Sequence, residues 1–174
     1  MNKAAIVDLL QKNHSNFIEL IGSMNENDFC KKVSDKWTPA QQAEHIHKSI
    51  YPLLLAFRLP LFILKLLFGK ANRSSISYEE LIEKYHQKLL TGYKAGKAYV
   101  PDNILFTQKN KLVGRLQKDI NGLCKLVDRF TEKQLDEYIL PHPLLGKLTI
   151  REMLYFTAYH VRHHQSSVEL IVHS

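Results

Sequence analysis

The sequence predicts an all-α fold, a four-helix bundle, from three observations. Apolar residues recur at helical spacing in four long segments, and no segment alternates apolar and polar residues as a half-buried strand would. Glycine and proline are few, with 7 and 6 in 174 residues. Amphipathic helices cannot bury their apolar faces alone, so these four are expected to pack together as a single domain over residues 1–174.

The first two long helices are expected over residues 3–24 and 39–68. The second begins after Thr38, whose hydroxyl can cap a helix that has proline at its first position. A bend or break is expected near Pro52 or Pro60, because proline removes a helical hydrogen bond and clashes with the preceding turn. This part of the chain therefore predicts one straight helix and one interrupted helix.

An extra helical excursion is expected between the second and third long helices, over residues 69–102. Within it, Ser77 and Glu80 resemble the capping box of a short helix over 78–91. The third long helix is expected over 103–130.

The last long helix follows Thr149, with Glu152 as its capping-box partner. The segment 131–147 before it contains two prolines and a glycine, so it is expected to be a connection with one short helical turn and no strand. Residues 25–36 are polar and are expected to form a loop.

Composition restricts the partners. A net charge of +7 makes nucleic acid and acidic membranes candidate partners. However, lysine and arginine are scattered, with no run of five and no nucleic-acid motif, so a solvated basic surface is the favoured interpretation. The apolar stretch 53–68 is shorter than the ~20 residues of a membrane span and contains Arg58 and Lys65, so it predicts a buried or partly interfacial helix. Cys30 and Cys124 form no motif, and the first residues do not show the apolar core of a signal peptide, so we expect a cytoplasmic protein.

His160 and His164 are the most informative residues of the chain. Four residues turn a helix by about 400°, so both imidazoles leave one face about one turn apart and can bind one metal ion. Their face is otherwise apolar, and an unpaired buried polar group costs about 1–3 kcal/mol. The alternative interpretation is two core histidines satisfied by tyrosine hydroxyls or water.

A catalytic zinc-type site needs a third protein ligand and an open position. His45 shares a helix strip with Gln42 and Ser49, a mixture that fits a pocket wall. His47 points about 200° away from His45, so only one of the two faces a common centre, and helical phase leaves the choice open. Further candidates are His142, His14 and His86.

Other polar residues near these motifs are candidates for the pocket wall or for orienting ligands. Histidine ligands normally donate their second ring nitrogen to an acceptor, and Gln42 and Gln165 are close enough in sequence to serve. His163 is expected at the rim of the site as a candidate substrate contact. His142, between two prolines, is a candidate pocket contact.

Two motifs resemble the DinB-like, or YfiT-like, metal-dependent proteins. WTPAQQAEHI, from Trp37 to Ile46, is similar to the start of the family's second helix, where a histidine follows the tryptophan by eight residues, as His45 does. PHPLLGKLTIREMLYFTAYHVRHHQ, from Pro141 to Gln165, is similar to the family's final motif, a Gly-x-Leu-Thr helix start followed by HxxxH. Both motifs stand in the family's order.

The resemblance implies an up-down-down-up bundle with a divalent metal held by His45, His160 and His164, so it favours His45 over His47. It also implies zinc or nickel as the metal and a homodimer as the common assembly. Family members include thiol transferases that use glutathione-type, bacillithiol-type or mycothiol cosubstrates. Residues 69–102 match the family least and are expected to shape the substrate pocket.

Three hypotheses on function follow. The first is a metal-dependent thiol transferase or hydrolase acting on a small molecule, in which the metal lowers the pKa of a bound water or low-molecular-weight thiol. The second is a non-catalytic dimeric bundle that acts as an interaction or stress protein, which is favoured if residue 45 faces solvent. The third is a basic nucleic-acid binder, which predicts a concentrated positive face and binding that weakens steeply with salt.

Overall fold

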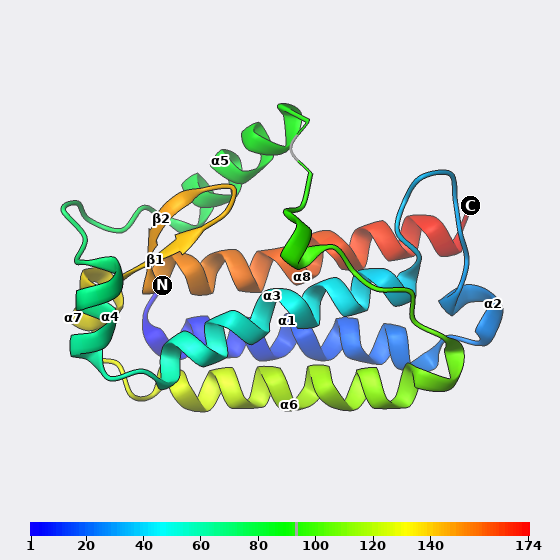
Figure 1. Cartoon of the computed structure of the whole chain (residues 1–174), viewed down its shortest axis with the longest axis horizontal. Helices are drawn as coiled ribbons and strands as arrows, with labels where there is room; N and C mark the ends of the chain where they lie inside the picture. Colours follow the sequence, from blue (N-terminus) through cyan, green and yellow to red (C-terminus); the bar gives the residue numbers. More distant parts are fainter. Residues whose placement is uncertain (93) are drawn as a thin grey trace.

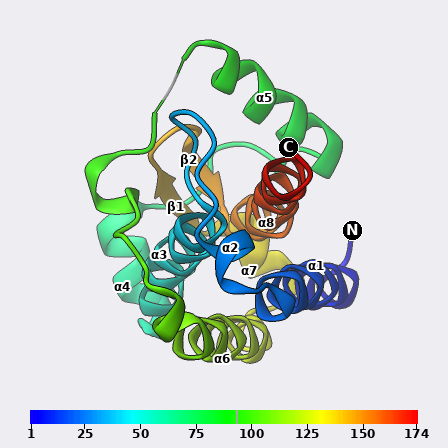
Figure 2. The same cartoon turned by 90° about the vertical axis from the view of Figure 1, so that its right-hand side faces the viewer.

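A computed structural model describes residues 1–92 and 94–174 of the chain. Four long helices form a bundle: α1 (Lys3–Ser23), α3 (Pro39–Arg58), α6 (Lys109–Val127) and α8 (Ile150–Val172). The colours of Figure 1 show that α1 and α8 run one way and α3 and α6 the other. Seen from the end in Figure 2, α1 packs on α6 and α8, and α3 packs on the same two helices. The all-α, up-down-down-up prediction is therefore confirmed.

The predicted apolar stripes form one core between the four helices. Each of these side chains contributes about 1.5–3 kcal/mol when it leaves water. Cys124 is buried among them, as a small apolar residue would be. Fully buried members from the four helices include Phe17, Ile21, Ile46, Ile50, Leu116, Ile120, Leu154 and Val161.

The second predicted helix is interrupted at Pro60, whereas Pro52 lies inside α3 without ending it. Leu59, the residue before Pro60, is extended, because a proline disfavours the helical conformation of its predecessor. α4 (Leu61–Phe68) then leaves at 116° to α3. In the part of the chain that the structure describes, no single helix has the length and apolarity to cross a membrane; only the bent pair α3 and α4 passes on length and composition together.

The prediction of no strand is wrong between α6 and α8. There, β1 (Ile139–His142) and β2 (Gly146–Thr149) form an antiparallel hairpin, after α7 (Glu132–Glu137), which supplies the predicted short helical turn. The strands are four residues long, too short to show alternation, and a proline stands in the first. Gly146 has a φ of +78°, a backbone conformation that glycine adopts without strain.

The stretch 25–36 also contains structure that was expected to be loop. A short helix, α2 (Glu26–Phe29), begins where the Asn25 side chain accepts a hydrogen bond from the backbone N–H of Asp28. Asparagine is a good N-cap and acidic residues favour the first turn, so the polar composition that suggested a loop is that of a helix start.

The excursion contains the predicted helix, α5 (Tyr78–Leu90), with the Ser77 and Glu80 capping box. α5 packs on the outer face of α8, and a single 3-10 turn, η1 (Lys97–Tyr99), packs on α3 (Figure 1). A second turn, η2 (Phe106–Gln108), precedes α6, so the third long helix starts six residues later than expected and ends at Val127 rather than 130. The excursion therefore covers the sides of α3 and α8 that carry the candidate histidines.

Candidate metal centre

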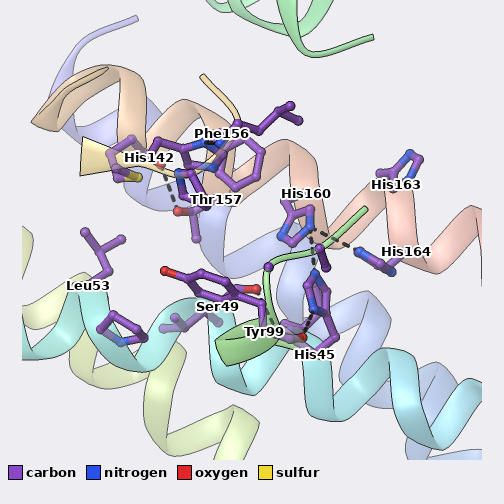
Figure 3. Close-up of a pocket in the computed structure, with 18 of the residues that line it drawn as sticks. His45, Ser49, Leu53, Tyr99, His142, Phe156, Thr157, His160, His163 and His164 are labelled. Atoms are coloured by element: carbon purple, nitrogen blue, oxygen red, sulfur yellow. Dashed lines mark hydrogen bonds between the residues drawn. The ribbon is translucent and has the colours of Figure 1, made fainter. Parts of the chain in front are cut away.

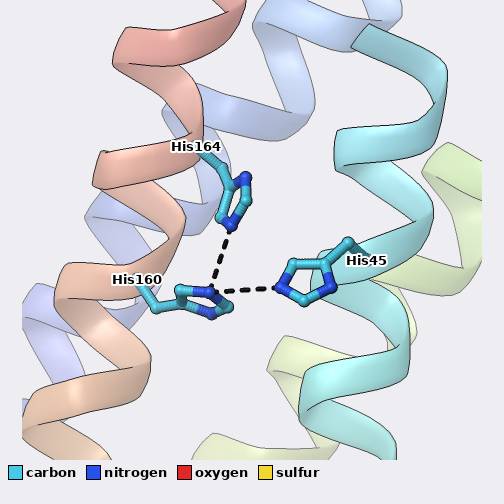
Figure 4. Close-up of side chains that lie close together, drawn as sticks. All are labelled: His45, His160 and His164. Atoms are coloured by element: carbon cyan, nitrogen blue, oxygen red, sulfur yellow. Dashed lines mark hydrogen bonds between the residues drawn. The ribbon is translucent and has the colours of Figure 1, made fainter. Parts of the chain in front are cut away.

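Three imidazoles meet between α3 and α8, as Figure 4 shows. His45 comes from α3, and His160 and His164 come from successive turns of α8. The Nε2 atom of His160 lies 3.3 Å from Nε2 of His45 and 3.1 Å from Nε2 of His164. All three side chains are buried, and one nitrogen from each lies within 4.8 Å of the other two.

Two of the three rings are held by acceptors on their other nitrogen. Nδ1 of His45 donates to the carbonyl oxygen of Tyr99 at 2.7 Å, and Nδ1 of His164 donates to Oε1 of Gln42 at 2.8 Å. Because these oxygens only accept, the ring hydrogens lie on Nδ1. The Nε2 atoms of both residues therefore carry lone pairs that point at the centre.

This arrangement leaves an unmatched lone pair. Nε2 of His160 carries at most one hydrogen, so it can donate to His45 or to His164 but not to both. A cation between the three atoms would satisfy all of them. Nitrogens that bind one tetrahedral zinc ion at ~2.0–2.1 Å lie about 3.3 Å apart, close to the spacing found here. The donor set therefore fits a divalent metal ion.

Burial keeps these imidazoles neutral. Desolvation lowers the pKa of His160 and His164 well below the ordinary histidine value, and the neighbouring histidines lower it further. Desolvation also lowers the pKa of His45, against the opposing effect of its hydrogen bond to Tyr99. Metal ions bind the neutral form of histidine, so the site is ready to bind without losing protons at neutral pH.

The structure resolves the choice between His45 and His47. His47 turns to α6, where its Nδ1 contacts Oδ2 of Asp119 at 2.5 Å. The hydrogen bond to Asp119 raises the pKa of His47, opposite to the direction in the cluster. His47 is therefore part of an ion pair between α3 and α6 and lies outside the cluster.

The remaining candidate residues are placed in different ways. The hydroxyl of Ser49 donates to the backbone carbonyl of His45, so it lines the site without touching the imidazole. His163 is half-buried at the rim, with its ring 5.3 Å from that of His164. Gln165 donates to Glu169 and is not brought to the centre.

The cluster opens onto a cavity of about 760 Å³, shown in Figure 3. Its wall combines α3, α4, α5, α8, the loop around Tyr99 and the β1–β2 hairpin, and includes His142 and His163. Among the described residues that line it, only Asp35 and Lys94 carry a formal charge. Apolar lining residues are Ile46, Ile50, Leu53, Phe68, Leu89, Leu140, Leu144, Met153 and Phe156.

Two features of the site had no useful signal in the sequence. The Tyr99 carbonyl is a backbone group, 54 residues from His45, so no side-chain pattern marks it. His14 looked remote in sequence but lines the cavity from α1. Its Nδ1 donates to the Leu10 carbonyl, and burial lowers its pKa to about 4.

Fold and site together define a class: helical-bundle proteins with a buried three-histidine cluster beside an apolar cavity. Residues 9–168 match the family model of the DinB superfamily, which covers most of the chain. The chain belongs to the DinB superfamily, as its two sequence motifs indicated. Neither the curated proteins nor the solved structures provide a match to it.

Proposed function

We propose that His45, His160 and His164 hold a divalent metal ion, zinc or nickel, and that the protein is a metal-dependent thiol transferase or hydrolase for a small molecule. The observation that carries the proposal is the convergence of three Nε2 atoms whose lone pairs cannot all be matched by N–H donors within the cluster. When bound, such an ion supplies a Lewis acid that lowers the pKa of water or a thiol and polarises an oxygen of the substrate.

The protein's own residues orient and shield the site. Gln42 and the Tyr99 carbonyl fix two of the rings, as acceptors beside metal-binding histidines do. Phe156 stacks on His160 at 4.7 Å between ring centroids, and Trp37 packs on His45 at 4.8 Å. These aromatic rings restrict water and hold the imidazoles in place.

The nucleophile would come from outside the chain. Neither cysteine lines the cavity, since Cys124 is in the core and Cys30 is on α2's C-terminal side. The hydroxyls of Ser49 and Thr157 in the wall donate to backbone carbonyls. We therefore propose water or a low-molecular-weight thiol cosubstrate as the nucleophile, and the net charge of +7 favours an anionic thiol.

Free cysteines and exposed apolar residues support two further parts of the proposal. Both cysteines are unpaired thiols, as a protein of the reducing cytoplasm would have them.

On α4, Phe62, Leu66 and Leu67 are exposed, and contiguous exposed apolar residues favour association, here as a homodimer. The buried position of His45 argues against a bundle without a site.

A turnover assay tests the proposal. Purified protein would be loaded with zinc or nickel and assayed with glutathione or bacillithiol plus an apolar epoxide, and with an apolar ester in water. We expect turnover to fall at least 100-fold in the variant His160→Ala/His164→Ala. It should persist in the control variant His173→Ala, because His173 is an exposed histidine just after α8. Absence of metal-dependent turnover, or equal turnover in the double variant, would contradict an enzymatic role.

A further inference from the structure

His142 presents an N–H group to the cavity in a fixed tautomer. It ends β1, and its Nδ1 accepts hydrogen bonds from the backbone N–H groups of Leu144 at 3.2 Å and Leu145 at 3.0 Å. A ring nitrogen that accepts two hydrogen bonds carries no hydrogen, so the hydrogen of the neutral ring lies on Nε2. Protonating Nδ1 would break both bonds to the hairpin turn. The ring therefore remains a neutral donor.

The Nε2–H group of His142 is unpaired and reachable. The two nitrogens lie on different edges of the ring, so Nε2 points away from the turn that holds Nδ1. Across the described residues, 1–92 and 94–174, Nε2 has no hydrogen-bond partner, and unlike Nε2 of His14 it is not fully buried, while the His142 side chain lines the cavity. An open donor in a mostly apolar wall is the kind of group that fixes the orientation of a ligand.

This donor lies on the same wall as the three-histidine cluster. The ring of His142 meets the ring of Phe156 edge-to-face at 4.2 Å, and Phe156 stacks on His160 at 4.7 Å. Figure 3 shows this order, with His142 and Phe156 on one side and His160 beside His45 and His164 on the other. One aromatic ring therefore separates the donor from the proposed metal site. The hairpin pairs His142 with Gly146, which limits movement of the donor.

We infer that Nε2–H of His142 donates a hydrogen bond to an oxygen of the substrate. The substrate class is then an apolar molecule that carries a carbonyl or similar acceptor oxygen about one aromatic ring from its reacting group. The role in a reaction rests on the proposed function, but the recognition itself needs no metal. His142 makes no proton transfer in this role: it orients the substrate and stabilises negative charge on the oxygen that it binds.

Two substitutions separate the roles of the two ring nitrogens. In His142→Asn the side-chain oxygen can occupy the place of Nδ1 and keep the bonds to Leu144 and Leu145, while the shorter amide leaves no N–H at the place of Nε2. In His142→Gln the longer amide can place an N–H near Nε2, while the acceptor for the turn is lost. The asparagine variant should keep the stability of the hairpin and lose recognition, and the glutamine variant should do the reverse.

Acetophenone and α-methylstyrene are matched probes, because they share shape and size but only the ketone has an acceptor oxygen. Their affinities would be measured by NMR titration of the full-length chain, with metal and after chelation. In the chelated chain we expect the wild type and His142→Gln to bind acetophenone about three- to tenfold more tightly than α-methylstyrene. This is the range expected for one net hydrogen bond. His142→Asn should bind both probes equally.

A second measurement reads the tautomer directly. Long-range ¹H–¹⁵N spectra of the imidazoles should show the hydrogen of His142 on Nε2 and a shift of that nitrogen when acetophenone is added. The inference is overturned by the opposite tautomer, by equal or absent binding of both probes to the wild type, or by a ketone preference that survives in His142→Asn. Because the affinities are also measured after chelation, this test does not depend on the metal. A chain that binds no metal but still prefers acetophenone to α-methylstyrene contradicts the proposed function and leaves the role of His142 standing.

Discussion

Two buried polar clusters on α8 differ in how far the protein itself satisfies them. At the start of the helix, the carboxylate of Glu152 is fully buried and accepts hydrogen bonds from the Arg73 guanidinium and from the backbone N–H groups of Ile76 and Thr149. About two and three turns further on, His160 and His164 face a shared centre that no protein hydrogen-bond pattern completes. Buried polar groups are normally paired, so the incomplete cluster is the one that indicates a ligand.

The two clusters should therefore respond differently to the same change. Removing a residue from the complete cluster leaves buried partners unsatisfied and destabilises the fold. Removing a residue from the incomplete cluster removes a lone pair that has no donor in the metal-free chain. It should therefore change the free energy of unfolding little and affect ligand binding instead. Three substitutions test this contrast, and acidification tests a buried imidazole outside both clusters; the four are given from the largest expected effect to the smallest.

Glu152→Leu should cause the largest loss of stability. It leaves the backbone N–H groups of Ile76 and Thr149 without an acceptor and removes the ion pair with Arg73. We expect the free energy of unfolding to fall by about 2–4 kcal/mol, because each backbone N–H left without an acceptor costs about 1–3 kcal/mol, whereas the Arg73 side chain is 40% exposed and can be hydrated. Urea denaturation measures it. Glu169→Leu, on the more exposed end of the same helix, should change it by less than about 0.5 kcal/mol, and an equal loss in both variants would contradict the contrast.

Acidification should destabilise the metal-free chain through His14. Burial lowers its pKa from 6.5 to about 4, so between these values the unfolded chain binds a proton that the folded chain does not. The free energy of unfolding therefore falls as the pH drops from 6.5 toward 4, by on the order of 2–3 kcal/mol for this group. Denaturation at several pH values should show a smaller decline in His14→Leu and an unchanged one in His173→Leu. Identical declines in all three would exclude His14 as the cause.

How much of this could be read from the sequence depends on the kind of interaction. The spacing of His160 and His164 defines a shared helix face without any tertiary information, and the capping signals at Thr38 and Thr149 locate both helices. Helical phase could not decide between His45 and His47, because the decision depends on which neighbour each side faces. The contact between His47 and Asp119 on α6 directs the His47 side chain away from the cluster.

The parts that the sequence did not reveal depend on backbone groups and short elements. The carbonyl of Tyr99 and the N–H groups that fix His142 have no residue-type signature. The four-residue strands of the hairpin are too short for a periodic pattern. His14 reaches the cavity only because α1 packs parallel to α8, a tertiary arrangement that local patterns do not report.

Gln42→Ala should weaken metal binding without removing it. The substitution takes away the acceptor that orients the ring of His164, and loss of such a partner typically costs 10–100-fold in metal affinity. Competition with a chromogenic chelator measures the dissociation constant. Gln165→Ala is the matched control, because its amide bonds to Glu169 and should leave the affinity unchanged. Equal effects of the two substitutions would argue against a positioning role for Gln42.

His160→Leu should have the smallest effect on the stability of the metal-free chain. Leucine fills a similar volume and removes the nitrogen that cannot satisfy both neighbours. We expect the free energy of unfolding to change by less than about 1 kcal/mol, although the same substitution type at Glu152 costs several. Urea denaturation in the presence of chelator gives the value. A loss as large as that of Glu152→Leu would show that the cluster is complete without a ligand.

The metal content of the purified protein tests the central claim most directly. Mass-spectrometric elemental analysis of the full-length chain, purified without chelator and loaded with zinc or nickel, should find about one divalent ion per chain. The variant His160→Ala/His164→Ala, prepared in the same way and shown to be folded, should retain less than a tenth of that amount. Equal metal content in the two proteins, or no metal in either, would contradict a cation site at the three histidines.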